Sequence, residues 1–130
     1  MADFAGRNLM LVFYPLDFSP TCTDQLSIYQ EVLGEVEAAG ASLVGVSVDS
    51  AFCHRAFCDS LGLTMPLLAD FHPKGEMSSA YGVFREERGM NTRSLVLVGT
   101  DGKVSWTHAS SVSGEFPGAN LIFDALEAAD

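Results

Sequence analysis

Three short apolar runs, separated by stretches with a helical pattern, most constrain how this chain can fold. Leu9 to Tyr14, Ser42 to Val48 and Arg93 to Val98 have the composition of buried strands. Between the first two runs, residues from about Thr23 to Ala39 are amphipathic, and Gly40 follows where a helix C-cap belongs. Strands that alternate with helices favour a central sheet with parallel pairing and helices on both faces.

The remaining segments extend this α/β order. Ser50 is placed to cap a helix that runs to about Leu61 and stops at Gly62. The Asp101-Gly102 pair predicts a tight hairpin that adds an antiparallel edge strand, Val104 to His108. Three further segments are expected to be a loop or short strand around Leu67 and Leu68, a short helix from Pro73 to Tyr81, and a last helix from Asn120 to about Ala128.

Length, composition and charge limit the class of protein. The 130 residues, 48% of them hydrophobic, predict a single domain over residues 1–130 with a real core. No apolar run has the length of a transmembrane helix and the N-terminus lacks the pattern of a signal peptide, so we expect a cytoplasmic protein. The net charge of −10 disfavours nucleic acid and anionic membranes as partners. Three cysteines without export signals indicate reactive or buried thiols rather than a disulfide framework.

Cys22 is the leading candidate for chemistry because it lies where the first strand ends and the first helix begins. The free N–H groups and the macrodipole of a helix N-terminus stabilise an anion there, and the thiolate is the nucleophilic form of cysteine. A lone cysteine at a helix start is more often a small apolar filler. The preceding residues, Pro15-Leu16-Asp17-Phe18-Ser19-Pro20-Thr21, reverse that preference.

These residues resemble the active-site loop of the peroxiredoxins, whose pattern is P-x-x-x-[T/S]-x-x-C. Pro15, Ser19 and Cys22 fill the pattern at the family spacing, after a Phe13-Tyr14 entry. The resemblance covers nearly the whole chain and continues through four later segments: Val48-Asp49-Ser50, Pro66 to Asp70, Ala80-Tyr81-Gly82-Val83 and Arg93 to Val98. It implies a thioredoxin fold. Family members usually begin with an extra hairpin, whereas this sequence starts almost at the first core strand.

The resemblance also implies roles for individual residues in a thiol peroxidase. Cys22 is then the peroxidatic nucleophile, and the Ser19 hydroxyl contacts both thiolate and peroxide. Pro15 shields the sulfur from water, since it has no N–H. Arg93 supplies a permanent cation. Without the family pattern, Ser19 reads as a turn residue and Arg93 as an exposed residue at a strand start.

The resemblance is strongest to the bacterioferritin comigratory protein branch, also called peroxiredoxin Q. Some members of that branch carry a resolving cysteine in the second helix, and Cys58 falls on that position, ahead of Gly62 and Pro66. The implied reaction is reduction of a hydroperoxide, resolution by a Cys22–Cys58 disulfide, and reduction by a thioredoxin-like dithiol protein. The alternative is a one-cysteine enzyme resolved by an external thiol. We expect separated sulfurs in the reduced form, and either a monomer or a homodimer.

Other classes of function fit less well. A thioredoxin-like disulfide reductase needs C-x-x-C, but Ser19 stands where the first cysteine belongs. A binding module without activity would not need the Pro15, Ser19, Cys22 and Arg93 set. A metal site is disfavoured, because Cys53, His54, Cys58 and His72 include no C-x-x-C pair; His54 is expected to face solvent or to bond locally. We therefore expect no cofactor and no metal.

Overall fold

The computed structural model of the chain describes residues 6–110 and 116–129. The strands are β1 (Asn8–Phe13), β2 (Ala41–Ser47), β3 (Leu67–Ala69), β4 (Phe84–Arg85), β5 (Met90–Asn91), β6 (Ser94–Val98) and β7 (Val104–Ala109). The helices are α1 (Pro20–Glu31), α2 (Leu33–Ala38), α3 (Ala51–Leu61), α4 (Glu76–Ala80) and α5 (Ala119–Ala129).

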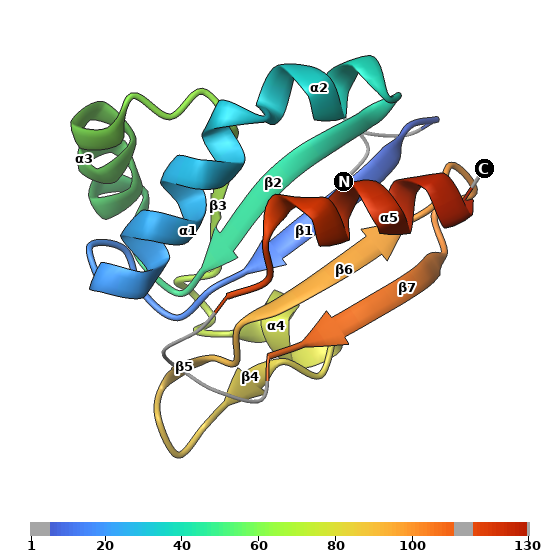
Figure 1. Cartoon of the computed structure of the whole chain (residues 1–130). Helices are drawn as coiled ribbons and strands as arrows, with labels where there is room; N and C mark the ends of the chain where they lie inside the picture. The colour runs from blue at the N-terminus through green and yellow to red at the C-terminus, as the bar shows by residue number, and fades with distance from the viewer. Residues whose placement is uncertain (1–5, 111–115, 130) are drawn as a thin grey trace.

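A five-stranded mixed sheet runs through the molecule in the order β3-β2-β1-β6-β7. The central strand β1 pairs in parallel with β2, with Met10 opposite Leu43, and antiparallel with β6, with Leu11 opposite Val96. The β6–β7 hairpin closes one edge and the short β3 closes the other. This arrangement confirms the predicted thioredoxin fold and its antiparallel edge (Figure 1).

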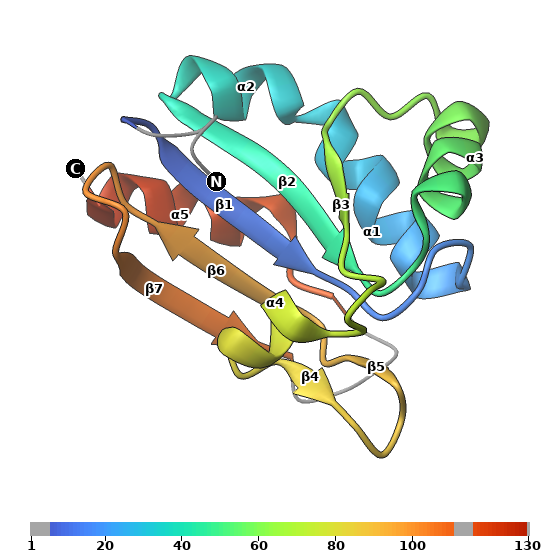
Figure 2. The same ribbon diagram turned by 180° about the vertical axis from the view of Figure 1, so that it is seen from behind.

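The two faces of the sheet are packed by different helices. Side chains of β1 alternate between the faces, because successive residues of a strand point to opposite sides. Met10 and Val12 pack with residues of α1, α2, α3 and α5 in one apolar cluster, whereas Leu9 and Leu11 pack with Val83 and residues of α4 in the other. Figure 2 shows α4 on the near side of the sheet, with α1, α2 and α5 behind it.

Several predicted bounds are confirmed closely. Ser50 caps α3, since its hydroxyl accepts a hydrogen bond from the Cys53 N–H at 3.2 Å. Gly62 ends that helix with a φ of 66°, the left-handed conformation that glycine adopts without a Cβ penalty. Among the described helices, none is long and apolar enough to cross a membrane.

Three expectations differ from the structure. The predicted helix from Thr23 to Ala39 begins earlier, at Pro20, and breaks at Val32 into α1 and α2, because Val32 leaves the helical conformation and its N–H bonds the Tyr29 carbonyl. The helix expected from Pro73 to Tyr81 is shortened to α4, after a series of turns. The β4–β5 ladder was not expected, since two-residue strands carry no periodicity that sequence reasoning can detect.

Candidate active site

The loop between β1 and α1 places Cys22 in the first turn of α1. Ser19 is the N-cap residue, and its carbonyl accepts from the Thr23 N–H at 2.9 Å. Phe18, just before it, has a φ of 68°, a conformation that bulky residues rarely adopt. Its ring packs on Phe57 of α3, with ring centroids 5.0 Å apart. Tertiary contacts therefore hold the loop in a strained turn that delivers Cys22 to the start of the helix.

Arg93, to which the family resemblance assigns the cation, lies against the Cys22 sulfur. Its Nη1 atom donates to Cys22 Sγ at 3.3 Å and to Gln25 Oε1 at 2.7 Å. Cys22 is 0% exposed and Arg93 only 5% exposed. A buried guanidinium needs a partner that offsets its lost hydration, and it stabilises negative charge on the neighbouring sulfur. Arg93 is therefore not an exposed residue at the start of a strand, which is the alternative interpretation of the sequence. It is a buried cation beside the Cys22 sulfur.

Ser19 and Pro15 are less directly engaged with the sulfur. The Ser19 hydroxyl donates to the Leu16 carbonyl at 3.0 Å, and no hydrogen bond joins it to Cys22 among the described residues. It is half-buried, as is Pro15. The Cys22 side chain is closed to solvent in this structure.

A buried polar cluster that the sequence reasoning missed fixes the same loop to α3. The Asp17 carboxylate accepts from the Tyr14 hydroxyl at 2.5 Å and from His54 Nδ1 at 2.6 Å. The other ring nitrogen of His54 lies 3.0 Å from the Leu68 carbonyl. Since both ring nitrogens face acceptors, His54 is held as an imidazolium.

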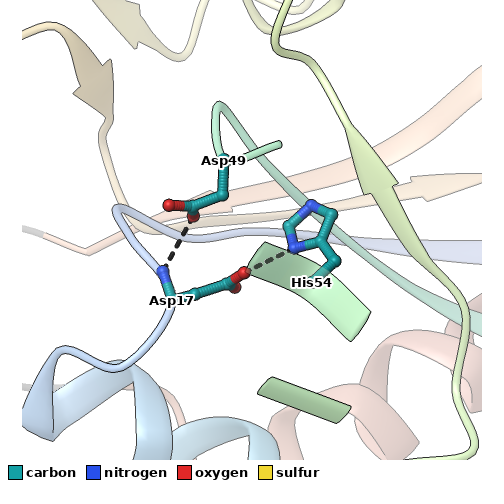
Figure 3. A group of neighbouring side chains, drawn as sticks. All are labelled: Asp17, Asp49 and His54. Carbon is teal, nitrogen blue, oxygen red and sulfur yellow. Dashed lines mark hydrogen bonds and ion pairs between the residues drawn. The ribbon is translucent and has the colours of Figure 1, made fainter. Parts of the chain in front are cut away.

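Asp49 extends this cluster from the end of β2. Its carboxylate accepts from the Asp17 N–H at 2.8 Å and from the Ser47 hydroxyl at 2.5 Å. Figure 3 shows the Asp17 backbone nitrogen directed at the Asp49 carboxylate and the Asp17 carboxylate directed at His54. The expectation that His54 faces solvent or bonds only locally is wrong, because its side chain is buried and pairs with a residue of another element.

The chain matches the model of the AhpC/TSA family over residues 1–107. It is 34% identical to alkyl hydroperoxide reductase E of Mycobacterium tuberculosis over 95% of this chain and 80% of that protein. A putative peroxiredoxin of Entamoeba histolytica is also 34% identical, over 80% of this chain but 47% of its own length. The chain belongs to the AhpC/TSA family of peroxiredoxins. Peroxiredoxins are enzymes that reduce hydroperoxides.

A solved structure supports the same assignment. The AhpC of Enterococcus faecalis superposes with a TM-score of 0.90 at 30% identity, over 98% of this chain and 77% of the AhpC chain. The chain spans about half the length of some curated relatives and about four fifths of others. These relatives are an AhpC, an alkyl hydroperoxide reductase E and a peroxiredoxin, and they do not point specifically to the bacterioferritin comigratory branch.

The other two cysteines of this peroxiredoxin lie on α3. All three thiols are free, and Cys53 and Cys58 are half-buried. Burial, then Asp17 and Asp49, raises the pKa of the Cys53 thiol to about 11. Burial, then the charges of Asp17 and Asp59, raises the pKa of Cys58. Both thiols are therefore protonated at neutral pH, which makes them weak nucleophiles there.

Among the described residues, one group of side chains is close enough together to hold a metal ion. It consists of Asp17, Asp49 and His54, whose possible ligand atoms lie within 4.8 Å of one another. This group differs from the cysteine and histidine set considered from the sequence. Its atoms already bond one another, Tyr14 and Ser47, and a cation would have to displace the proton that joins His54 to Asp17. The donor set therefore fits a hydrogen-bonded brace better than a metal site.

Proposed function

We propose that this chain reduces hydroperoxides with Cys22 as the peroxidatic nucleophile. The observation that carries the proposal is the contact between the buried Cys22 sulfur and Arg93 Nη1, at 3.3 Å, at the start of a helix. The cation and the helix N-terminus both stabilise negative charge on the sulfur. The positive charge of the same guanidinium also favours the oxygen that becomes negative as the peroxide bond breaks.

The reaction is a two-electron transfer from sulfur to peroxide. The Cys22 thiolate attacks the terminal oxygen of ROOH, so that an S–O bond forms while the O–O bond breaks. The departing RO⁻ takes a proton and leaves as ROH, and Cys22 becomes a sulfenic acid. Ser19 is proposed to hold the peroxide through its hydroxyl once the loop opens, and Pro15 to keep water away.

We further propose that Cys58 resolves the sulfenic acid within the same chain. Its sulfur attacks that of Cys22, a disulfide forms and water leaves. Supporting this, Cys58 packs against the same apolar cluster that contains Cys22, and α3 lies beside α1 in both views (Figures 1 and 2). A disulfide needs the two Cα atoms within about 7 Å, and we propose that α3 or the first turn of α1 unwinds to bring them there.

The substrate and partners follow from this chemistry. A small hydroperoxide carries no charge, so the net charge of −10 does not oppose its entry. A thioredoxin-like dithiol protein would reduce the Cys22–Cys58 bond and return the thiols. Assignment to the peroxiredoxin Q branch, a cytoplasmic location and a monomeric or homodimeric state remain predictions from the sequence.

Stoichiometric peroxide consumption tests the activity. The reduced protein is expected to remove one equivalent of hydrogen peroxide without any added reductant. Cys22→Ser is expected to remove none while keeping its circular dichroism spectrum, whereas Cys53→Ser behaves like the parent. Consumption by Cys22→Ser at the parent rate would refute the proposal, and so would a parent chain that reduces a model disulfide but no peroxide.

Disulfide mapping after one equivalent of peroxide tests the resolution step. The expected product is a Cys22–Cys58 bond within one chain. A Cys22–Cys53 bond or an intermolecular bond would refute the assignment of Cys58. A sulfenic acid that persists with no disulfide would establish the alternative, a one-cysteine enzyme that uses an external thiol.

A further inference from the structure

A continuous row of hydrogen bonds leads from the Cys22 sulfur to the segment before α5. Arg93 Nη1 donates to Cys22 Sγ and to Gln25 Oε1. Gln25 Nε2 donates to the Tyr29 hydroxyl at 3.3 Å, and that hydroxyl donates to the Pro117 carbonyl at 2.6 Å. Gln25 and Tyr29 are both 0% exposed. Bulk solvent therefore does not reach the hydrogen bond between these two side chains.

The direction of every bond in this row is determined by its two ends. A guanidinium has only donors, and the Pro117 carbonyl has only lone pairs. The Tyr29 proton must therefore point at Pro117, which leaves the hydroxyl oxygen to accept from the Gln25 amide. The Gln25 carbonyl oxygen is then the atom that faces Arg93.

The Tyr29 hydroxyl is what distinguishes the two orientations of the Gln25 amide. With it, the NH₂ group has an acceptor and the carbonyl oxygen meets the guanidinium. Without it, the buried NH₂ group loses that acceptor, and a flip would set its N–H groups against those of Arg93. The flip removes the 2.7 Å hydrogen bond from Arg93 Nη1 and sets an N–H group against the atom that also contacts the sulfur, so the contact between Arg93 and Cys22 is weakened.

We propose that Tyr29 is a positioning residue for the peroxide reaction, because its hydroxyl orients the Gln25 amide that holds Arg93 against Cys22. This inference rests on the proposed function of Cys22 and Arg93. The Tyr29 ring packs in the apolar core beneath the helices. Its hydroxyl also joins α1 to the segment before α5, through the hydrogen bond to the Pro117 carbonyl.

The protonation state of Tyr29 agrees with this arrangement. Burial raises the pKa of Tyr29 to about 12, against the opposing effects of the Gln25 hydrogen bond and the Arg93 charge. The hydroxyl consequently remains a donor to Pro117 and an acceptor for Gln25 throughout the pH range in which a peroxidase is assayed. The neighbouring Phe116 ring meets the Tyr29 ring edge-on, with centroids 6.4 Å apart.

The test is a double-mutant cycle on the full chain, read as the second-order rate constant with hydrogen peroxide. Tyr29→Phe is expected to lower the rate constant about tenfold, the effect of one unmade buried hydrogen bond in the site. In the Gln25→Glu background the same change is expected to alter the rate constant less than about twofold. A carboxylate only accepts, so either of its oxygens meets Arg93 without help from Tyr29.

Two controls separate positioning from packing. Tyr81→Phe removes a hydroxyl from the apolar cluster on the other face of the sheet and is expected to leave the rate constant unchanged. The unfolding midpoint of each variant is measured beside the rate constant. If Tyr29→Phe alone fails to fold, a folded Gln25→Glu/Tyr29→Phe chain supports the proposal, and failure of both to fold overturns it.

Each remaining outcome decides the question. An equal loss of rate in both backgrounds, or no loss for Tyr29→Phe, would overturn the positioning role of Tyr29. Cys22→Ser is assayed in the same series. Peroxide reduction by Cys22→Ser would reject the proposed function itself, whereas an inactive Cys22→Ser beside a fully active Tyr29→Phe would reject only the inference about Tyr29.

Discussion

At the scale of single residues, the site is a sulfur held between a helix N-terminus and one buried cation. Arg93 Nη1 serves two acceptors at once, Cys22 Sγ and Gln25 Oε1, so its geometry matters as well as its charge. Arg93→Ala is expected to lower the second-order rate constant with peroxide about a hundredfold, the usual effect of removing a transition-state donor. Stopped-flow kinetics measures it, with circular dichroism as the folding control.

Arg93→Lys is the matched comparison. Lysine keeps the charge but places it on a flexible chain without the guanidinium plane, and it is expected to recover only part of the loss. Full activity in Arg93→Ala would place the cation of the reaction elsewhere. Recovery to the parent rate in Arg93→Lys would mean that charge alone, without the planar fork, is sufficient.

Ser19→Ala is expected to lower the same rate constant by several-fold, because the peroxide loses a hydroxyl contact worth about 1 kcal/mol. The hydroxyl donates to the Leu16 carbonyl in this structure, and the proposed contact with peroxide requires it to leave that acceptor. Ser19→Thr keeps the hydroxyl and is expected to retain activity. Equal rate constants for Ser19→Ala and Ser19→Thr would mean that the Ser19 hydroxyl does not contact the peroxide and that Ser19 serves only as the N-cap residue of α1.

At the scale of elements, α3 carries both His54, which pairs with Asp17 of the active-site loop, and the proposed resolving thiol of Cys58. Ser50→Ala removes the acceptor of the Cys53 N–H and is expected to destabilise the protein by about 1 kcal/mol. If Cys58 reaches Cys22 through unwinding of α3, this variant forms the disulfide faster than the parent. Ser50→Thr, which keeps an acceptor, is the control. Slower or unchanged disulfide formation in Ser50→Ala would mean that α3 does not open.

The pH dependence of that step follows from the Cys58 thiol. Its pKa is raised by burial first and then by Asp17 and Asp59, so little of it is thiolate at neutral pH. The rate of Cys22–Cys58 disulfide formation is therefore expected to rise with pH through the neutral range and beyond. Asp59→Asn removes one of the two charges and is expected to move this rise to lower pH. A rate independent of pH would exclude attack by the Cys58 thiolate.

The elements also show what the sequence predicts and what it does not. Long segments with a clear period, such as α3 between the Ser50 cap and Gly62, were placed almost to the residue, because local physics sets both ends. The break at Val32 and the β4–β5 ladder were missed, since they depend on packing partners distant in sequence. In the site, the family resemblance, and not the local pattern, implied a role for Arg93. The brace joining Asp17, Asp49 and His54 carries no local pattern.

At the scale of the whole molecule, the buried His54–Asp17 pair connects the active-site loop to α3 and links stability to pH. Burial opposes the charged ring, but the hydrogen bond and charge of Asp17 prevail, and the pKa of His54 is raised. Native His54 thus keeps its proton at pH values where the unfolded residue, with a pKa of about 6.5, has lost it. The stabilisation is complete below about pH 6.5 and declines as pH rises through the higher native value.

His54→Asn is expected to abolish this loss of stability with rising pH. It is also expected to lower the free energy of unfolding by about 3 kcal/mol at low pH, because Asp17 is left buried without its charged partner. Denaturant unfolding at a series of pH values measures both effects. His72→Asn changes an exposed histidine and is expected to keep the parent profile. A parent protein whose stability rises from pH 6 to 9, or a His54→Asn variant that keeps the decline, would contradict a charged His54.

The central claim is that peroxide first oxidises Cys22, and locating the first added oxygen tests it most directly. Cys58→Ser is treated with one equivalent of hydrogen peroxide so that no Cys22–Cys58 disulfide can form. A sulfenic acid trapping reagent is present, and the labelled peptide is identified by mass spectrometry. The predicted result is one label per chain, on the peptide that contains Cys22. Label on the peptide that contains Cys53, or no label with the peroxide unconsumed, would contradict the account.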